Sequence, residues 1–240
     1  MLSPAAQHVM RTTAALLNLS EHGYAPKHAN QYEMMLAKLH EDKRRLKAVQ
    51  SMEKKAEIKR DILPDYIPWV EGVLTSASGC QDDVLMTVMV WRIDAGEFIG
   101  ALQIARYALT HQLSLPDQYQ RTTACLLAEE FSEAVFRAQT IGANVDIDSL
   151  LALESLTQNQ DMPDQVRAKL HKAIGYGLMA SKGSDSSELD MASKKTALNH
   201  LRRAWQLHDK AGVKKDIESL ERALKNAADL NKSSPVTGGG

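Results

Sequence analysis

The chain has 240 residues, with 29 Lys and Arg, 30 Asp and Glu, and 44% apolar side chains. This length and composition predict a soluble globular protein of one to three compact units with sizeable cores. The longest strongly apolar run, from Val84 to Trp91, is too short to span a bilayer, and the first twenty residues lack the pattern of a secretory signal. We therefore expect a cytoplasmic protein with no membrane segment, in which Cys80 and Cys125 are reduced thiols rather than a disulfide framework.

The near-neutral total charge conceals a strong segregation along the chain. Residues 1–60 carry 11 basic and 6 acidic side chains, residues 61–180 carry 7 and 16, and residues 181–240 carry 11 and 8. Blocks of one sign indicate partners and self-association more than they indicate a fold. The basic first block is expected to meet nucleic acid or an acidic partner.

The first helix is predicted to begin at an N-cap formed by Ser3, with Pro4 in the first helical position, and to end near Leu19. The turn between Gly23 and Pro26 follows it. This helix and turn are the single candidate in the chain for a helix-turn-helix-like unit, the kind of element that places side chains in a DNA groove.

From Lys27 onwards, apolar residues recur at helical spacing, which predicts one long helix. Pro64 and Pro68 end it, because proline lacks an amide donor and restricts the residue before it. Intervals of seven residues, Leu39 to Leu46 and Val49 to Ala56, suggest a thin coiled-coil seam. Residues 1–62 are therefore expected to serve DNA binding and oligomerisation.

The rest of the chain reads as helical hairpins, and no alternating β-branched run calls for a strand. The predicted helices are Asp82–Ala95 and Phe98–Leu109, Gln118–Thr140 and Ile147–Gln158, Val166–Met179, and Ala192–Lys210 and Val213–Asn231. The predicted fold is all-α: a long basic helix followed by antiparallel hairpins that are partly tetratricopeptide-like. We divide it into a central core at 63–181, a linker at 182–190, a C-terminal hairpin at 191–231 for partner docking, and a disordered tail at 232–240.

Two segments carry a resemblance to a known family: KRRLKAVQSMEKKAEIKRDILPDYIPWVEGVL, which starts at Lys43, and DDVLMTVMVWRIDAGEFIGALQIARYAL, which starts at Asp82. The chain resembles the small terminase subunits of tailed phages of the peduovirus type, over most of its length from about Ser3 to Leu224. The most specific part is the basic helix together with the residues that follow it, Leu63, Pro64, Tyr66, Pro68, Trp69, Gly72 and Leu74.

The resemblance implies a late viral protein that recognises the cohesive-end packaging site of concatemeric, double-stranded phage DNA in the host cytoplasm. It implies a homo-oligomer that hands the DNA to the large terminase subunit, with the procapsid or portal as a further partner. Members of this family are also labelled the endonuclease component of terminase. The alternatives from other functional classes are an endonuclease in its own right and a helical-repeat scaffold that does not bind DNA.

The basic stretch provides the candidate DNA contacts. Phosphate contacts by Lys and Arg give affinity through counterion release, without reading sequence. The alternative is a solvated helix whose charges pair with one another at i,i+4 spacing. The candidate residues are Lys38, Lys43, Arg44, Arg45, Lys47, Lys54, Lys55, Lys59 and Arg60.

No catalytic or metal-binding motif is evident, and no cofactor is expected unless the endonuclease alternative holds, in which case Mg²⁺ is needed. The acidic groups are read as helix caps, turn residues or an exposed helix face, namely Asp82/Asp83, Asp94/Glu97, Glu129/Glu130/Glu133 and Asp146/Asp148. The eight histidines appear scattered, with no metal-site spacing. A glycine-rich phosphate loop is absent, so ATP hydrolysis must belong to a partner.

The aromatic residues are interpreted chiefly as core. Tyr66 and Trp69 lie between prolines and are expected to anchor a helix end rather than to stack on bases. Trp91 and Trp205 are also predicted to be buried. The C-terminal hairpin carries Arg202, Arg203, Lys214 and Lys215, which suit a docking surface for the large subunit or procapsid.

Overall fold

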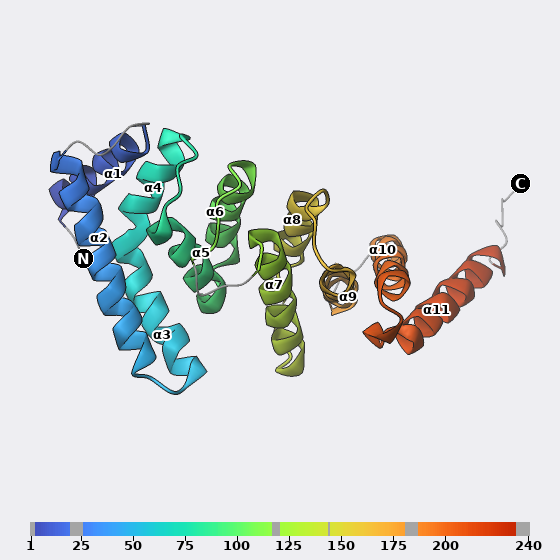
Figure 1. Ribbon diagram of the computed structural model, residues 1–240. Helices are drawn as coiled ribbons and strands as arrows, with labels where there is room; N and C mark the ends of the chain where they lie inside the picture. Colours follow the sequence, from blue (N-terminus) through green and yellow to red (C-terminus); the bar gives the residue numbers. More distant parts are fainter. Residues whose placement is uncertain (1–2, 20–25, 117–120, 144, 181–186, 234–240) are drawn as a thin grey trace, which may run out of the picture. The chain divides into compact units, whose positions relative to one another are not determined.

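The computed structural model describes residues 3–19, 26–116, 121–143, 145–180 and 187–233. These residues form α-helices and two short 3-10 turns, and the described ranges contain no strand (Figure 1). The predicted all-α class is therefore confirmed, whereas the tetratricopeptide-like detail stays a prediction. The chain divides into two compact units, residues 1–126 and residues 127–240.

The first unit contains α1 (Pro4–Leu19), α2 (Pro26–Lys47), α3 (Met52–Ile62), the 3-10 turn η1 (Leu63–Tyr66), α4 (Ile67–Ser76), α5 (Asp83–Ala95) and α6 (Phe98–Thr110). The helix α7 (Thr123–Thr140) begins in the first unit and continues into the second. The second unit adds α8 (Ile147–Thr157), α9 (Asp164–Ala180), α10 (Ser187–Leu207), the 3-10 turn η2 (Asp209–Ala211) and α11 (Lys214–Ser233).

The expectation of one long basic helix is wrong, because the stretch forms α2 and α3 with a turn between them at residues 48–51. Ser51 causes the restart. Its backbone is extended, and its side-chain oxygen accepts from the Lys54 amide at 3.3 Å, which satisfies a first-turn donor of α3. The two helices run antiparallel, so α3 returns alongside α2 (Figure 1).

The suggested coiled-coil seam is also corrected by the structure. Leu39 and Leu46 are 1% and 7% exposed and are buried by the chain itself within the first unit. Asp42, which interrupts the seam, is buried with them and accepts a hydrogen bond from the Tyr66 hydroxyl at 2.7 Å. These positions form an intramolecular core and are not available to a second copy of the chain.

The turn between α3 and α4 anchors this core, as its two aromatics predicted. Tyr66 and Trp69 are almost fully buried, and the Trp69 indole nitrogen donates to Asp82 at 3.0 Å. Tyr32 of α2 stacks on Trp69 with ring centroids 5.7 Å apart, and Trp91 of α5 meets the Tyr66 ring edge-on. Three helices and the turn therefore share one aromatic cluster.

The first predicted hairpin is confirmed as α5 and α6, joined at Gly96 in a left-handed conformation with φ of 82°. The helix α5 is buried nearly all round, and Ala101, Ala105 and Ala108 of α6 are fully buried. These small side chains permit a close approach of α6 to α5.

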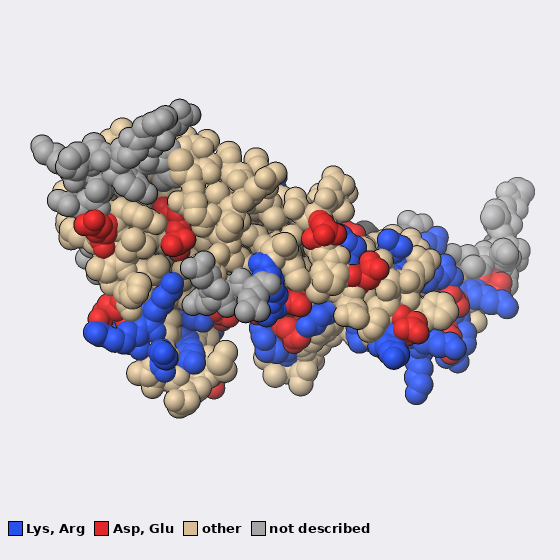
Figure 2. Space-filling view, in the orientation of Figure 1, with Lys and Arg blue, Asp and Glu red and all other residues tan. Residues whose placement is uncertain are grey.

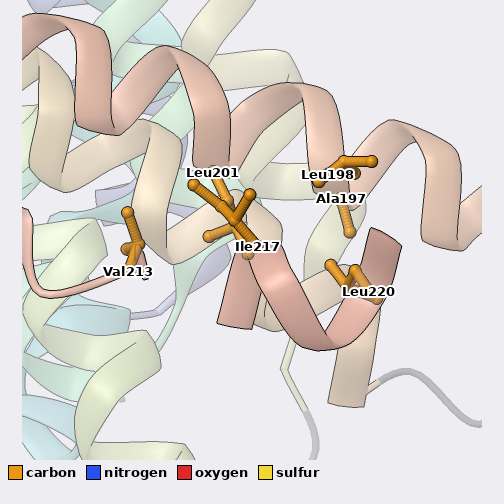
Figure 3. Close-up of a cluster of buried hydrophobic side chains, with 6 residues drawn as sticks. All are labelled: Ala197, Leu198, Leu201, Val213, Ile217 and Leu220. Carbon is orange, nitrogen blue, oxygen red and sulfur yellow. The ribbon is translucent and has the colours of Figure 1, made fainter. Parts of the chain in front are cut away.

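The C-terminal hairpin is confirmed as α10 and α11, which turn at Gly212 with φ of 74°. Its apolar core is the cluster in Figure 3, to which Leu201 and Val213 contribute fully buried side chains. The helix α10 also packs closely on α9, because Gly175 leaves room for the Leu201 side chain. Trp205 was expected in this core, but it is 45% exposed. Trp205 follows Leu201 by four residues and lies on the same side of α10, but it stands in the last turn of the helix, where its side chain is only partly covered.

Parts of the predicted turn, linker and tail lie outside the residues that the structure describes. Pro26 is the first residue of α2, and the predicted turn at 23–26 falls largely on residues 20–25, which lie outside the described residues. The same holds for residues 182–186 of the predicted linker and 234–240 of the predicted tail, whereas residues 187–190 belong to α10 and residues 232–233 to α11.

Gly72 provides a test of the α1–α4 contact. A Cβ at this position would collide with the backbone carbonyl of Arg11 and lie 2.7 Å from the Ala14 Cβ, and neither neighbour can rotate away. We expect Gly72→Ala to destabilise the first unit by about 1–3 kcal/mol, despite the roughly 1 kcal/mol that alanine gains over glycine in a helix. The measurement is chemical denaturation followed by circular dichroism.

Gly100→Ala in α6 is the matched control. A Cβ there would meet only the flexible end of the Arg92 side chain, so its effect should stay within about 1 kcal/mol. Equal stability of the two variants would contradict the close packing of α1 on α4.

Candidate nucleic-acid interface

The antiparallel arrangement of α2 and α3 gathers cations at one end of the first unit. Arg44, Arg45 and Lys47 occupy the last turn of α2, and Lys54 and Lys55 lie at the beginning of α3. We call these five residues the basic tip. Lys and Arg side chains form a continuous blue area over this part of α2 and α3 in Figure 2.

The side chains of the basic tip face solvent to different degrees, and their ion pairs are local. Arg44 is 78% exposed and pairs with Glu41, and Lys54 is 63% exposed and pairs with Glu57 at 2.7 Å. Exposed pairs one helical turn apart are weak and are screened by salt. Arg44 and Lys54 can therefore exchange their carboxylate partners for a phosphate. Arg45, Lys47 and Lys55 form no ion pair with the described part of the chain.

Two predicted contacts, Lys38 and Lys59, have structural partners instead. The Lys59 ammonium pairs with Asp94 of α5 and is only 11% exposed. Lys38 bonds Asp42 at 2.9 Å and Asp65 at 3.2 Å, and its ammonium lies 4.9 Å from the centre of the Tyr66 ring. Partial burial acts to lower the pKa of Lys38, but the hydrogen bonds that its ammonium donates to these two carboxylates raise the pKa above its ordinary value.

The remaining two candidates, Lys43 and Arg60, are intermediate. Lys43 is half-buried, and desolvation lowers its pKa below the usual value for lysine. Arg60 is exposed, but its Nε donates to the Ala95 carbonyl at 3.2 Å, which ties the guanidinium to the end of α5. Among the basic tip, Lys55 is half-buried like Lys43, whereas Arg44, Arg45, Lys47 and Lys54 are exposed.

Several of the acidic residues have the capping roles in helices that the sequence predicted. Asp82 and Asp146 are confirmed as N-caps, accepting from the Leu85 amide at 2.8 Å and the Ser149 amide at 3.1 Å. Burial raises the pKa of Asp82, while its hydrogen bonds from backbone and indole donors act in the opposite direction. The predicted exposed face at Glu129, Glu130 and Glu133 is wrong, because all three side chains are half-buried, and Glu133 pairs with Lys169 of α9. Asp82, Asp146 and Glu133 thus have capping or ion-pairing functions in the fold.

One group of potential ligands escaped the sequence reasoning. Glu154, His171 and His200 come together in the second unit, and they form the only such group of three among the described residues. They lie on three different helices, 17 and 29 positions apart, so no local spacing could reveal them. Only the packing of α8, α9 and α10 brings them together.

An apolar hollow of about 520 Å³ lies elsewhere on the first unit, between α1, α2 and α4. Met34, Met35, Val9 and Trp69 line much of it, and Lys38, already paired, is its one charged residue. This surface is unsuited to a phosphate backbone, which leaves the basic tip as the candidate nucleic-acid interface of the first unit.

The chain is similar to known proteins of one family. A family model described as phage small terminase subunit matches residues 36–165, a range that contains the basic tip and the aromatic turn. The terminase endonuclease subunit of Escherichia phage P2 is 49% identical over 226 residues, which cover 94% of this chain and 87% of that protein. A probable terminase endonuclease subunit of Haemophilus phage HP1 is 27% identical over 88% of this chain and 78% of that protein. No solved structure matches the chain.

The division between structural and exposed cations can be measured by stability. Lys59→Met removes the partner of Asp94, whose side chain is 29% exposed, and we expect a loss of about 1–2 kcal/mol in unfolding free energy. Lys54→Met is the matched control and should leave thermal and chemical stability unchanged, because its pair is exposed. If Lys59→Met were as stable as the parent, the ion pair with Asp94 would not support the fold, and Lys59 would again be a candidate DNA contact.

Proposed function

Because the chain belongs to the phage small terminase subunit family, we propose that it binds the packaging site of concatemeric viral DNA and delivers this DNA to the large terminase subunit. The family assigns it to viral DNA packaging. Packaging of a phage genome takes place in the host cytoplasm, where the proposed partners are double-stranded phage DNA, the large subunit and further copies of this chain.

The observation that supports DNA binding most strongly is the exposed basic tip. Its five cations lie within twelve consecutive residues, at the same end of two antiparallel helices. A duplex carries phosphates at short, regular intervals, so a compact cationic projection can displace several counterions at once. This contact supplies affinity and orientation, while base-specific readout requires other groups in a groove.

The burial and ion pairs of the nine candidate side chains support a smaller set of phosphate contacts. We assign phosphate contact to Arg44, Arg45, Lys47, Lys54 and Lys55, with Arg60 and Lys43 at the margin. Lys38 and Lys59 act through the fold, since each is held by a carboxylate of the first unit. The role of these two lysines is to position the helices that carry the basic tip.

Energy for packaging must come from the partner in this proposal, because the sequence has no phosphate loop for ATP. The exposed face of the C-terminal hairpin is the proposed docking surface for the large subunit or the procapsid. Trp205 is 45% exposed on α10 and lies close in sequence to Arg202 and Arg203, which are also exposed. Exposed tryptophan and arginine are the residue types that most often dominate protein interfaces.

A second candidate function is DNA cleavage by this chain, because two relatives carry endonuclease in their names. Such an activity would require Mg²⁺ or another divalent metal held near the scissile phosphate. Recognition is favoured over cleavage by the capping and ion-pairing roles of Asp82, Asp94, Glu133 and Asp146. An assay that measures DNA binding and strand cleavage together distinguishes the two functions.

The test uses the purified full chain without its large subunit, incubated with DNA carrying the phage end site in Mg²⁺ across a salt series. Binding and strand cleavage are measured in the same samples. We expect salt-sensitive binding without cleavage, and the variant Arg44→Gln/Arg45→Gln/Lys47→Gln/Lys54→Gln should bind at least about tenfold more weakly. Its plot of log affinity against log salt should be less steep by about 3 to 4, which is close to one unit for each lost contact.

The matched control replaces four exposed cations of the C-terminal hairpin by glutamine, namely Arg203, Lys214, Lys215 and Lys225. It makes the same change in net charge and should retain the parental salt dependence. Equal losses in both variants would show a general charge effect, and unchanged affinity in the first would refute the basic tip. Metal-dependent cleavage abolished by a carboxylate substitution would establish the endonuclease function instead.

The proposed docking surface makes a separate prediction. Trp205→Ala should weaken capture of the large subunit at least about tenfold, as loss of an interface tryptophan commonly does, while DNA affinity and folding stay unchanged. Co-purification and calorimetry with the large subunit measure the effect. Exposed Met52 on α3 gives the control, Met52→Ala, which should bind the large subunit normally. Parental binding by Trp205→Ala would exclude this face of α10.

A further inference from the structure

Three helices of the second unit direct metal-binding atoms toward one point. Glu154 comes from α8, His171 from α9 and His200 from α10. The Nδ1 atoms of the two histidines are 3.0 Å apart, and the Glu154 Oε1 lies 3.6 Å from one and 3.9 Å from the other. Both histidine side chains are largely buried, with 12% and 13% exposure, and Glu154 is 30% exposed.

These separations match the edges of a metal coordination polyhedron. With metal–nitrogen and metal–oxygen bonds of about 2.0–2.2 Å, two ligands of a tetrahedral ion stand roughly 3.3 Å apart. The three observed distances scatter around this value. Small side-chain rotations would bring the three distances closer together.

The protonation states also suit a metal. Burial, followed by the nearby charges of His200, Arg203 and Arg167, lowers the pKa of His171 to about 4. Burial likewise lowers the pKa of His200, although Glu154 acts in the opposite direction. Burial of both rings favours the neutral imidazole, which presents the lone pair that a metal ligand needs.

A plain hydrogen bond between the rings explains less of this arrangement. One imidazole can donate from Nδ1 to the other at 3.0 Å, but Glu154 is then too far from both nitrogens for a hydrogen bond. A shared cation accounts for all three groups, because it attracts the carboxylate and occupies the space where both lone pairs converge. Coordination of the ion through Nδ1 requires each imidazole ring to carry its proton on Nε2.

The donor set selects the kind of ion. Two imidazole nitrogens and one carboxylate suit Zn²⁺ and related first-row metals, whereas Mg²⁺ and Ca²⁺ prefer sites composed of oxygen. The positive charges of Arg167 and Arg203 nearby also disfavour an ion held by electrostatic attraction alone. A metal that forms strong bonds to nitrogen overcomes this repulsion more readily.

We infer that Glu154, His171 and His200 bind a divalent transition-metal ion of the Zn²⁺ class, which fastens α8, α9 and α10 to one another. Three protein ligands leave a fourth position for water. The ion would hold α10, the first helix of the C-terminal hairpin, on the rest of the second unit. This inference is independent of the proposed DNA-binding role of the first unit.

The test is a titration of the metal-free full chain with Co²⁺, whose visible absorption reports nitrogen coordination in a low-symmetry site, followed by displacement with Zn²⁺. We expect one equivalent to bind, and Mg²⁺ to produce no displacement. At Zn²⁺ concentrations of roughly 100 times the dissociation constant, the melting temperature of the second unit should rise by roughly 10 °C.

His171→Asn and His200→Asn should each weaken Zn²⁺ binding at least about 100-fold, since even the loss of an outer-shell partner costs about 10–100-fold. Asparagine keeps a polar atom near the former Nδ1. The control is His208→Asn, which lies beyond the end of α10 and should leave Co²⁺ absorption and Zn²⁺ affinity unchanged. Glu154→Gln retains both imidazoles and the side-chain shape, so it reports on the site even if a histidine variant fails to fold.

Several results would overturn the inference. The first is the absence of one-equivalent Co²⁺ binding by the parent chain. Parental Zn²⁺ affinity in Glu154→Gln and in either histidine variant that folds would also exclude this site, and loss of binding in His208→Asn would place the ion elsewhere. None of these readouts depends on DNA binding or cleavage, so they stand whether or not the proposed packaging role is correct.

Discussion

The buried carboxylate of Asp42 is the constraint on which the arrangement of the first unit depends. It accepts from the Tyr66 hydroxyl at 2.7 Å and from the Lys38 ammonium at 2.9 Å, so both of its partners come from the region where α2 meets the turn η1. A buried charge without partners costs several kcal/mol, which makes this set of contacts selective for a single packing of α2. Burial raises the pKa of the Tyr66 hydroxyl, which keeps it a hydrogen-bond donor.

This network separates cations that support the fold from cations that face solvent. Lys38 and Lys59 pair with carboxylates at the end of the α2–α3 hairpin that packs on the rest of the unit. The basic tip lies at the opposite end, where the turn at 48–51 leaves few neighbours. The aromatic contacts of Trp69 and Tyr66 fix the first end to the rest of the unit, so the basic tip is carried on a packed base.

The second unit is organised around α10, which packs on both α9 and α11. Leu201 and Ala197 fill the space beside Gly175, and the same helix places His200 against His171. Apolar packing and the proposed metal ion thus act on the same interface. Trp205, in the last turn of the same helix, is 45% exposed, and it is the residue on which the proposed docking surface depends.

Local chemistry explains what could be predicted from the sequence. The all-α class, the caps at Ser3, Asp82 and Asp146, and the hairpin turns at Gly96 and Gly212 follow from helical periodicity and from the conformations that these residues favour. The basic stretch could be recognised for the same reason, because charge is a property of composition. The restart at Ser51 was missed since a single capping serine has a weak signal inside a strong helical pattern.

Tertiary packing decided the rest, because it joins residues whose separation in sequence has no fixed relation to distance in space. Asp94 lies 35 positions from Lys59 and converts a predicted DNA contact into a structural ion pair. Packing also decided how far along α10 the apolar side is covered, so that Leu198 and Leu201 are buried while Trp205 in the last turn is 45% exposed. The sequence by itself determined which helices form and where charge is concentrated, while only the fold decided which cations remain free and which histidines meet.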